Sequence, residues 1–294
     1  MTATEPIIEL KNISYFYRNS KTEALKDISL KIYPGEKVAF LGANGAGKST
    51  LFKHLNGILK PYSGEVLIHG ETISKRNIVK VRQTVGIVFQ NPDDQILAPS
   101  VEQDIAFGPI NMGLSENEVE SRVNEALKLV NITGLKDRSP HHLSGGQKKR
   151  VAIAGILAMR PEVIVLDEPT AGLDPRAAEN IMAVIDKMNH ELGITIILST
   201  HDVDMVPLFA DRVFIMHHGR IEAQGTAKEI FKQPGLLEHV HLRMPRIACV
   251  FELLQAEGLD VETKVTPVDA RDEILRLLNS PENKRWKLHG NNSH

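Results

Sequence analysis

Cysteine is almost absent from this chain of 294 residues, which contains only Cys249. A single cysteine excludes an internal disulfide and is typical of proteins from a reducing cytosol. Cys249 lies in the apolar segment 247–251. The sequence therefore predicts a buried, unreactive thiol.

Long hydrophobic runs are also missing. The longest nearly apolar run covers residues 151–159, about half of what a membrane-spanning helix requires. Residues 1–6 contain neither the basic nor the apolar region of a signal peptide. We therefore expect a soluble chain that associates with a membrane only through a partner.

Neither sign of charge dominates, because 35 lysines and arginines oppose 37 acidic residues and the formal net charge is −2. A basic field that attracts nucleic acid is therefore missing, and we expect no nucleic-acid partner. The 12 histidines include pairs at 141–142 and 217–218. Their spacing matches no known ligand set, so we predict no metal site built from them.

A glycine-rich loop at residues 42–49 is the most informative segment present. It fits G-x-x-x-x-G-K-S, follows the apolar run 38–41 and precedes a helix-forming stretch. Such glycines let main-chain N–H groups surround phosphate oxygens at the positive end of the next helix. Lys48 can reach the β- and γ-phosphates, and the Ser49 hydroxyl can ligate Mg²⁺. The loop residues predicted to bind a nucleoside triphosphate are Gly42, Asn44, Gly45, Ala46, Gly47, Lys48, Ser49 and Thr50.

Hydrophobic patterning predicts an α/β fold. Alternating apolar residues at 8–10 and 28–32 favour antiparallel strands, and the continuous runs 85–89, 163–166 and 194–198 are typical of a buried parallel sheet. Residues 90–161 have a helical pattern, with Ser115 and Ser144 as helix N-caps. Residues 212–224 should form a hairpin. The segment after about 234 reads as helices with a short strand at 261–265.

Two carboxylates follow the apolar run 163–166. Burial of this strand would place Asp167 and Glu168 at its carboxyl end, where ligands bind in parallel α/β sheets. Asp167 would hold Mg²⁺, directly or through water. Glu168 would polarise the attacking water as general base.

The pentapeptide Leu-Ser-Gly-Gly-Gln at 143–147 indicates which class of nucleotide-binding protein this is. Ser144 can cap the following helix, and the two glycines leave main-chain N–H groups uncovered for an anion. Here the sequence resembles the ATP-binding-cassette (ABC) ATPases, whose signature motif is this pentapeptide, and the resemblance extends from about residue 7 to 225. It implies a P-loop NTPase of the ABC type, with a parallel-sheet core, an antiparallel β subdomain and a helical subdomain at about 93–160. The signature residues expected to contact ATP are Ser144, Gly145, Gly146 and Gln147.

The same resemblance implies roles for three further side chains. Tyr17 matches the aromatic residue that stacks on adenine, with Tyr15 and Phe16 as alternatives. Gln90 matches the glutamine that reaches Mg²⁺ and the lytic water. His201 matches the switch histidine that contacts the γ-phosphate and positions the base.

A dimer is implied as well. In the resembled family the signature of one subunit closes over ATP that is held by the phosphate loop of the other. The loop 171–174, which ends at Asp174, matches the segment that crosses this interface. We expect a homodimer, or a heterodimer with a similar ATPase.

The Asn-Pro-Asp-Asp-Gln segment after Gln90 is more restricted. It resembles the ATPase subunits of energy-coupling-factor importers, above all the cobalt and nickel branch. The resemblance implies a translocase at the cytoplasmic face of the membrane, which powers cobalt import through integral-membrane coupling and substrate-binding subunits. Nickel or vitamin import, or a soluble non-transport ABC ATPase, is the alternative. Asp93 and Asp94 should cap the next helix, which would present Gln95 and Ile96 to a partner.

The chain divides into three parts on this interpretation. Residues 1–233 would form the ABC ATPase domain, 234–280 a small α+β extension that promotes dimerisation, and 281–294 a disordered tail. The apolar residues expected to form contacts in the extension are Leu242, Ile247, Val250, Leu253 and Leu254.

Overall fold

Two β-sheets lie at the centre of the chain in the computed structural model, which describes residues 5–18 and 20–279. The smaller sheet is antiparallel, with the order β2-β1-β4-β5. Its strands are β1 (Ile8–Phe16), β2 (Glu23–Ile32), β4 (Ser63–Ile68) and β5 (Glu71–Thr72). Ile8 pairs with Ile32, and Leu10 with Leu30, so the predicted antiparallel strands are confirmed.

The larger sheet has the order β10-β9-β3-β8-β7-β6. Its strands are β3 (Lys37–Leu41), β6 (Val85–Val88), β7 (Val163–Asp167), β8 (Thr195–Ser199), β9 (Arg212–His217) and β10 (Arg220–Gly225). The strands from β9 to β6 run parallel, and β10 pairs antiparallel with β9 as the predicted hairpin. The carboxyl ends of β3, β8, β7 and β6 therefore share one edge, where the loops that follow them meet.

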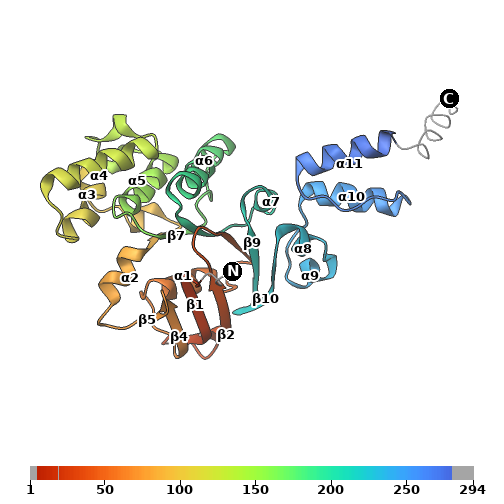
Figure 1. Cartoon of the computed structure of the whole chain (residues 1–294), viewed down its shortest axis with the longest axis horizontal. Helices are drawn as coiled ribbons and strands as arrows, with labels where there is room; N and C mark the ends of the chain where they lie inside the picture. The colour runs from red at the N-terminus through yellow and green to blue at the C-terminus, as the bar shows by residue number, and fades with distance from the viewer. Residues whose placement is uncertain (1–4, 19, 280–294) are drawn as a thin grey trace.

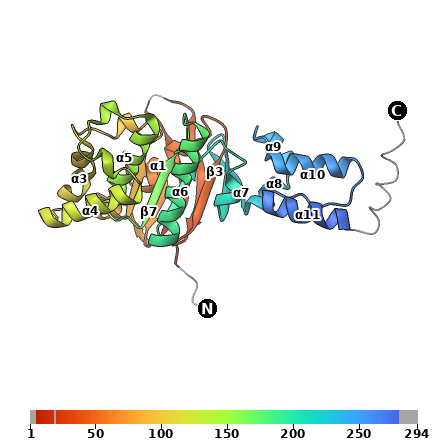
Figure 2. The same cartoon turned by 90° about the horizontal axis from the view of Figure 1, so that it is seen from above.

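Both faces of this sheet are buried, which explains the continuous apolar runs. Along β3, Ala39 and Leu41 enter one hydrophobic core, while Val38 and Phe40 enter another on the opposite face. The helices of this part are α1 (Lys48–Leu55), α2 (Ile78–Thr84), α6 (Pro175–Leu192) and α7 (Val206–Phe209). Figure 2 shows α6 alongside β7 and β3.

A helical part occupies one end of the molecule (Figure 1). It contains the helices α3 (Val101–Asn111), α4 (Glu116–Leu129) and α5 (Gly145–Leu157), and the 3₁₀ helices η1 (Pro92–Asp94), η2 (Thr133–Leu135) and η3 (Pro140–His142). Ser115 caps α4 and Ser144 caps α5, so both predicted caps are confirmed. The expectation that Asp93 and Asp94 cap the next helix is wrong. They lie inside η1, and the Ser100 side chain caps α3.

The C-terminal segment is helical. It comprises α8 (Ala227–Phe231), α9 (Pro234–His239), α10 (Arg246–Ala256) and α11 (Pro267–Asn279). Phe231 and Leu237 join the main core, whereas Phe251, Val261 and Ala270 form a small core of their own. Accordingly, α10 and α11 lie side by side beyond the cassette (Figures 1 and 2).

The short strand expected at 261–265, and with it the α+β character of the extension, is wrong. This segment has no regular secondary structure and pairs with no strand of the described structure. Val261 and Val265 are buried, while Glu262 forms ion pairs with Lys228 and Lys264. The hydrogen bond from Lys232, followed by those from Lys264 and Lys228, lowers the pKa of Glu262. Apolar anchors and ion pairs therefore fix the segment without a sheet.

The prediction of a buried thiol is also wrong. Cys249 is exposed, because α10 turns only part of its apolar run inward and buries Ala248 and Phe251 instead. The predicted tail at 281–294 lies outside the described residues.

Candidate functional site

The loop between β3 and α1 is enclosed by neighbouring main chain. A Cβ atom on Gly42 would lie 2.2 Å from the carbonyl oxygen of Met216 in β9. Gly47, with a φ of 106°, would place a Cβ 2.8 Å from the carbonyl oxygen of Ala24 in β2. Only glycine fits such contacts, and at Gly47 the positive φ also favours it. The fold thus holds the loop in the open shape that a phosphate group needs.

Lys48 lies inside this loop. Its ammonium donates hydrogen bonds to the carbonyl oxygens of Gly42 at 2.7 Å and Ala43 at 3.1 Å. Burial lowers the pKa of Lys48, and the charges of Glu168 and Asp167 partly offset this effect. The cation is therefore held between the loop and the carboxylates at the end of β7.

The loop forms a pocket of about 440 Å³. It is lined by Tyr17, Ala24, Asn44, Gly45, Ala46, Gly47, Lys48, Ser49, Thr50, Gln90 and Glu168. Of the three aromatic candidates, Tyr17 lines the pocket, and its hydroxyl lies 2.9 Å from Thr50 Oγ1. Tyr15 packs against His54, and Phe16 against Tyr62. The geometry therefore favours Tyr17 as the adenine-stacking residue.

Two of the predicted catalytic residues converge on the carboxylate of the third. Gln90 follows β6, Glu168 follows β7 and His201 follows β8, and these strands are neighbours in the sheet. Gln90 Nε2 donates to Glu168 Oε2 at 2.8 Å, and His201 Nε2 contacts Glu168 Oε1. Both oxygens of Glu168 thus have a partner, which fixes the direction of the side chain.

Asp167 is anchored by a residue that the sequence analysis missed. Ser199 Oγ donates to Asp167 Oδ1 at 2.6 Å and accepts the Glu168 N–H at 2.9 Å. The side chains of Ser49, Gln90 and Asp167 offer oxygen atoms, which Mg²⁺ prefers. This donor set beside the phosphate loop fits a magnesium ion.

The signature residues do not join this pocket. Ser144 and Gly145 are exposed at the start of α5, and no residue of 144–147 lines the pocket of the phosphate loop. The Ser144 side chain accepts the Gln147 N–H, and Gln147 Oε1 accepts the Ser144 N–H. Asp174, also exposed, caps α6 through the Ala177 N–H. Within one chain, the two predicted phosphate-binding elements remain separate.

Lys149 is a second residue that the sequence analysis missed. It is buried in α5, and its ammonium donates to the carbonyl oxygens of Ala171 at 2.7 Å and Glu168 at 3.1 Å. Burial lowers its pKa, an effect that the charge of Glu168 opposes. The sequence signal for a buried Lys149 is that its neighbours on the same face of α5, such as Ala152 and Ile153, are apolar.

A groove of about 650 Å³ lies between α2, α3 and α5. Three of its lining side chains are apolar and exposed: Val79 at 68%, Leu97 at 83% and Phe107 at 66%. Gln95 also lines this groove, so its contact with a partner stays a prediction, whereas the same expectation for Ile96 is wrong. The Gln95 side chain accepts the N–H of Phe89, just after β6, and donates to the Ala152 carbonyl oxygen in α5, while Ile96 packs against the core.

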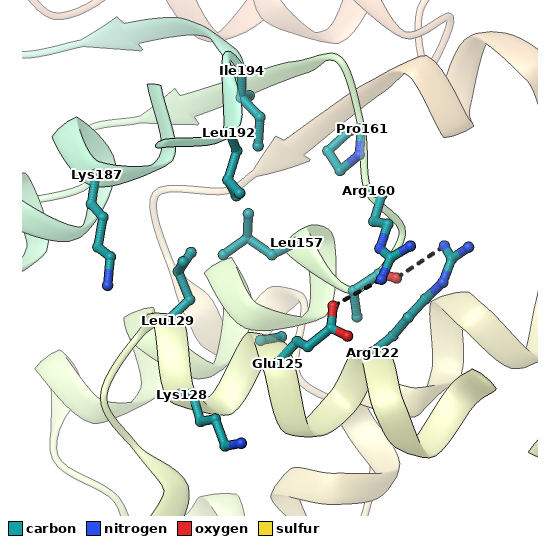
Figure 3. A pocket seen from close by; sticks show the side chains of 12 residues that line it. Arg122, Glu125, Lys128, Leu129, Leu157, Arg160, Pro161, Lys187, Leu192 and Ile194 are labelled. Carbon is teal, nitrogen blue, oxygen red and sulfur yellow. Dashed lines mark hydrogen bonds and ion pairs between the residues drawn. The ribbon is translucent and has the colours of Figure 1, made fainter. Parts of the chain in front are cut away.

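Another hollow, of about 550 Å³, lies between α4 and the end of α6 (Figure 3). Leu129, Leu157 and Leu192 form part of its apolar lining, and Arg160 pairs with Glu125 at its rim. None of the predicted site residues lines it, so it is distinct from the nucleotide pocket.

Comparison with known proteins identifies the family. The ABC transporter family matches residues 25–171. A putative ABC transporter ATP-binding protein from Methanosarcina acetivorans is 66% identical over 94% of this chain and 84% of its own length. The energy-coupling factor transporter ATP-binding protein EcfA of Methanocaldococcus jannaschii is 54% identical, over 92% of this chain and 98% of its own length.

Solved structures agree with this result. The structure of cbiO1 from Clostridium perfringens, described as part of the ABC transporter complex cbiONQ, is 50% identical with a TM-score of 0.73. It covers 84% of this chain and 99% of its own. A dimeric ATP-binding cassette in a post-hydrolysis state, bound to ADP and Pi, is 31% identical with a TM-score of 0.68, over 75% of this chain and 98% of its own.

Across the described part of the chain, no helix has both the length and the apolar character of a membrane span. The fold is that of the ABC cassettes, and these relatives are ATP-binding proteins of energy-coupling-factor transporters. The chain belongs to the ATP-binding proteins of ABC transporters and, within them, to the energy-coupling-factor ATPases.

Proposed function

We propose that this ATPase drives the import of cobalt ions through membrane partners, from the cytoplasmic face of the membrane. The observation that carries the catalytic part is the convergence of Gln90 and His201 on Glu168, beside the phosphate loop. The choice of cobalt rests on the resemblance of residues 91–109 to the cobalt and nickel branch. The likeness to a chain of the cbiONQ complex supports it.

Each side chain has a chemical task in this proposal. Lys48 binds the β- and γ-phosphates, and Tyr17 stacks on the adenine. Glu168 accepts a proton from the attacking water, while Gln90 and His201 hold its carboxylate in place. When bound, Mg²⁺ neutralises charge on the phosphates.

The proposed active unit is a pair of chains, head to tail. Ser144 and its two following glycines present main-chain N–H groups at the exposed start of α5, outside their own chain's pocket. An anion that is held by a second chain's phosphate loop can reach them there. The dimeric cassettes among the solved structures support this arrangement. A heterodimer with a similar ATPase would satisfy the same geometry.

The groove at Leu97 is the proposed docking site for a cytosolic helix of a membrane subunit. Leu97 and Phe107 project from the loop after η1 and from α3, and Val79 projects from α2. The apolar face of an amphipathic helix would cover this set of exposed aliphatic and aromatic side chains. Gln95, which also lines the groove, accepts the N–H of Phe89, the residue before Gln90, so the groove is tied to the catalytic residues.

The extension is proposed to strengthen the pairing of two chains. Of the predicted contact residues, Ile247 and Leu254 pack within the extension and Leu242 packs against the main core. Val250 and Leu253 are exposed on α10 and remain available. Deletion of residues after 245 should weaken dimerisation while ATP binding persists. Equal dimerisation of the truncated and full chains would contradict this part of the proposal.

Cobalt transport itself is tested by reconstitution. The chain is purified with the membrane proteins that accompany it, and uptake of radiolabelled cobalt into vesicles is measured with ATP. We expect uptake by the wild type, no uptake by Glu168→Gln, and weak competition by nickel. Uptake of nickel or a vitamin in place of cobalt would correct the substrate. Failure of any membrane protein to accompany the chain would favour a non-transport ATPase.

A further inference from the structure

The main chain at Glu168 has an unusual conformation. Its φ is 49°, in the left-handed region that side-chain-bearing residues rarely adopt. Residues held in such conformations persist only where their surroundings fix them, and they gather at functional sites. The surroundings of Glu168 therefore determine where its carboxylate points.

Hydrogen bonds hold both sides of this residue. Its N–H donates to Ser199 Oγ at 2.9 Å. Its carbonyl oxygen accepts the Ala171 N–H at 3.1 Å and the Lys149 ammonium, also at 3.1 Å. The same ammonium donates to the Ala171 carbonyl oxygen at 2.7 Å. Lys149 thus bridges the two ends of the turn that follows β7.

Lys149 is buried, so its ammonium depends on these hydrogen bonds. An ammonium that is removed from water carries a large desolvation penalty. The acceptors found for it within the described structure are two main-chain carbonyl groups rather than a carboxylate. Lys148, the preceding residue, instead reaches Asp93 on η1 and is partly exposed. The two adjacent lysines therefore have different environments.

We propose that Lys149 is a positioning residue for Glu168. By holding the carbonyl groups of Glu168 and Ala171, it keeps the turn after β7 in the shape that directs the carboxylate toward Gln90 and His201. Lys149 also belongs to α5, the helix that Ser144 caps, so one side chain joins the signature segment to the base. This inference rests on the proposed role of Glu168.

The test compares substitutions at two neighbouring positions in the full-length protein. Lys149→Met keeps the length of the side chain but removes the donor, and Lys149→Gln keeps one neutral donor. Lys148→Met is the matched control on the same helix. For each, kcat and the ATP dissociation constant are measured separately. ATP-dependent dimerisation is measured in a Glu168→Gln background.

We expect Lys149→Met to lower kcat by about tenfold to a hundredfold and the ATP dissociation constant to stay within about twofold. Lys149→Gln should have a higher kcat than Lys149→Met, and Lys148→Met should lower kcat less than Lys149→Met does. The double variant Lys149→Met, Glu168→Gln should still form dimers with ATP. If Lys149→Met fails to fold, Lys149→Gln carries the test through its kcat.

Two results would overturn the inference. One is a kcat for Lys149→Met within about twofold of the wild type. The other is a loss of dimerisation that accounts for the whole loss of kcat, which would assign Lys149 to the interface. Retained hydrolysis by Glu168→Gln alone would instead refute the role of Glu168, so the two failures are distinguishable.

Discussion

Leu97→Glu is the sharpest perturbation of the proposed docking groove. Leu97 is 83% exposed, so its side chain contributes little to the core of its own chain. Its N–H donates to Asp104 Oδ1 at 2.9 Å, and this main-chain bond survives the substitution. A carboxylate at position 97 would nevertheless lie near that of Asp104. Leu97→Gln, which is polar without charge, therefore accompanies it.

The magnitude follows from the burial that docking would bring. Covering a leucine side chain contributes about 1.5–3 kcal/mol, which is about tenfold to a hundredfold in partner affinity. A carboxylate forced into the covered groove adds a desolvation cost. The free energy of unfolding of the isolated chain should change by less than about 0.5 kcal/mol for Leu97→Gln, because the side chain is exposed.

Three measurements on one preparation decide the matter: thermal stability, basal ATPase activity and co-purification with the membrane partner. We expect the first two to be unchanged for Leu97→Gln and co-purification to be lost for Leu97→Glu. Leu192→Glu, at an exposed leucine away from the groove, is the matched control and should retain the partner. A Leu97→Glu protein that binds its partner and remains fully coupled would refute the docking site.

Three further predictions concern the nucleotide site and its support. Lys48→Ala should abolish tight ATP binding, which a titration can measure. Glu168→Gln should still bind ATP but lose about a hundredfold or more in kcat, and it should form a dimer with Mg-ATP in size-exclusion chromatography. Ser199→Ala should lower kcat/KM by about tenfold or more, because it removes a hydrogen bond from buried Asp167 and an acceptor from the Glu168 N–H; unchanged kinetics in the folded variant would contradict this support. Burial lowers the pKa of His54, so the unfolded chain binds its proton more readily and stability should fall as pH drops below about 6.5. Between pH 7.5 and 5.5 the melting temperature should fall less for His54→Gln than for the wild type. An identical fall in both proteins would contradict a lowered pKa of His54.

Much of the site could be predicted because strand ends and loop motifs are local in sequence. The run 163–166 predicts a buried strand, and the two carboxylates after it must emerge at the sheet edge beside the phosphate loop. Gln90 and His201 follow two other strands of the same sheet. Their convergence on Glu168 depends on the strand order β8-β7-β6, which the structure shows and the sequence analysis did not predict.

Other features depend on contacts that no local pattern encodes. The sequence at 261–265 alternates like that of a strand, but a strand needs a neighbour, and Glu262 binds lysines instead. Cys249 lies in an apolar run, yet a helix on the surface buries only one side of such a run. Lys149 looks like an ordinary helix lysine until the turn after β7 folds against it.

Gln95 gives the docking groove a direct connection to the catalytic residues. Its Oε1 accepts the Phe89 N–H at 3.2 Å, next to Gln90, and its Nε2 donates to the Ala152 carbonyl oxygen in α5, also at 3.2 Å. Leu97 is two positions further along the same short segment. A partner that moves Leu97 therefore acts on a segment with two attachments. Gln95 ties this segment to Phe89, just after β6, and to α5, the helix of the signature motif. Since Gln90 holds Glu168, the physical contacts for coupling partner binding to hydrolysis lie within a single chain, even though the complete ATP site is proposed to need two.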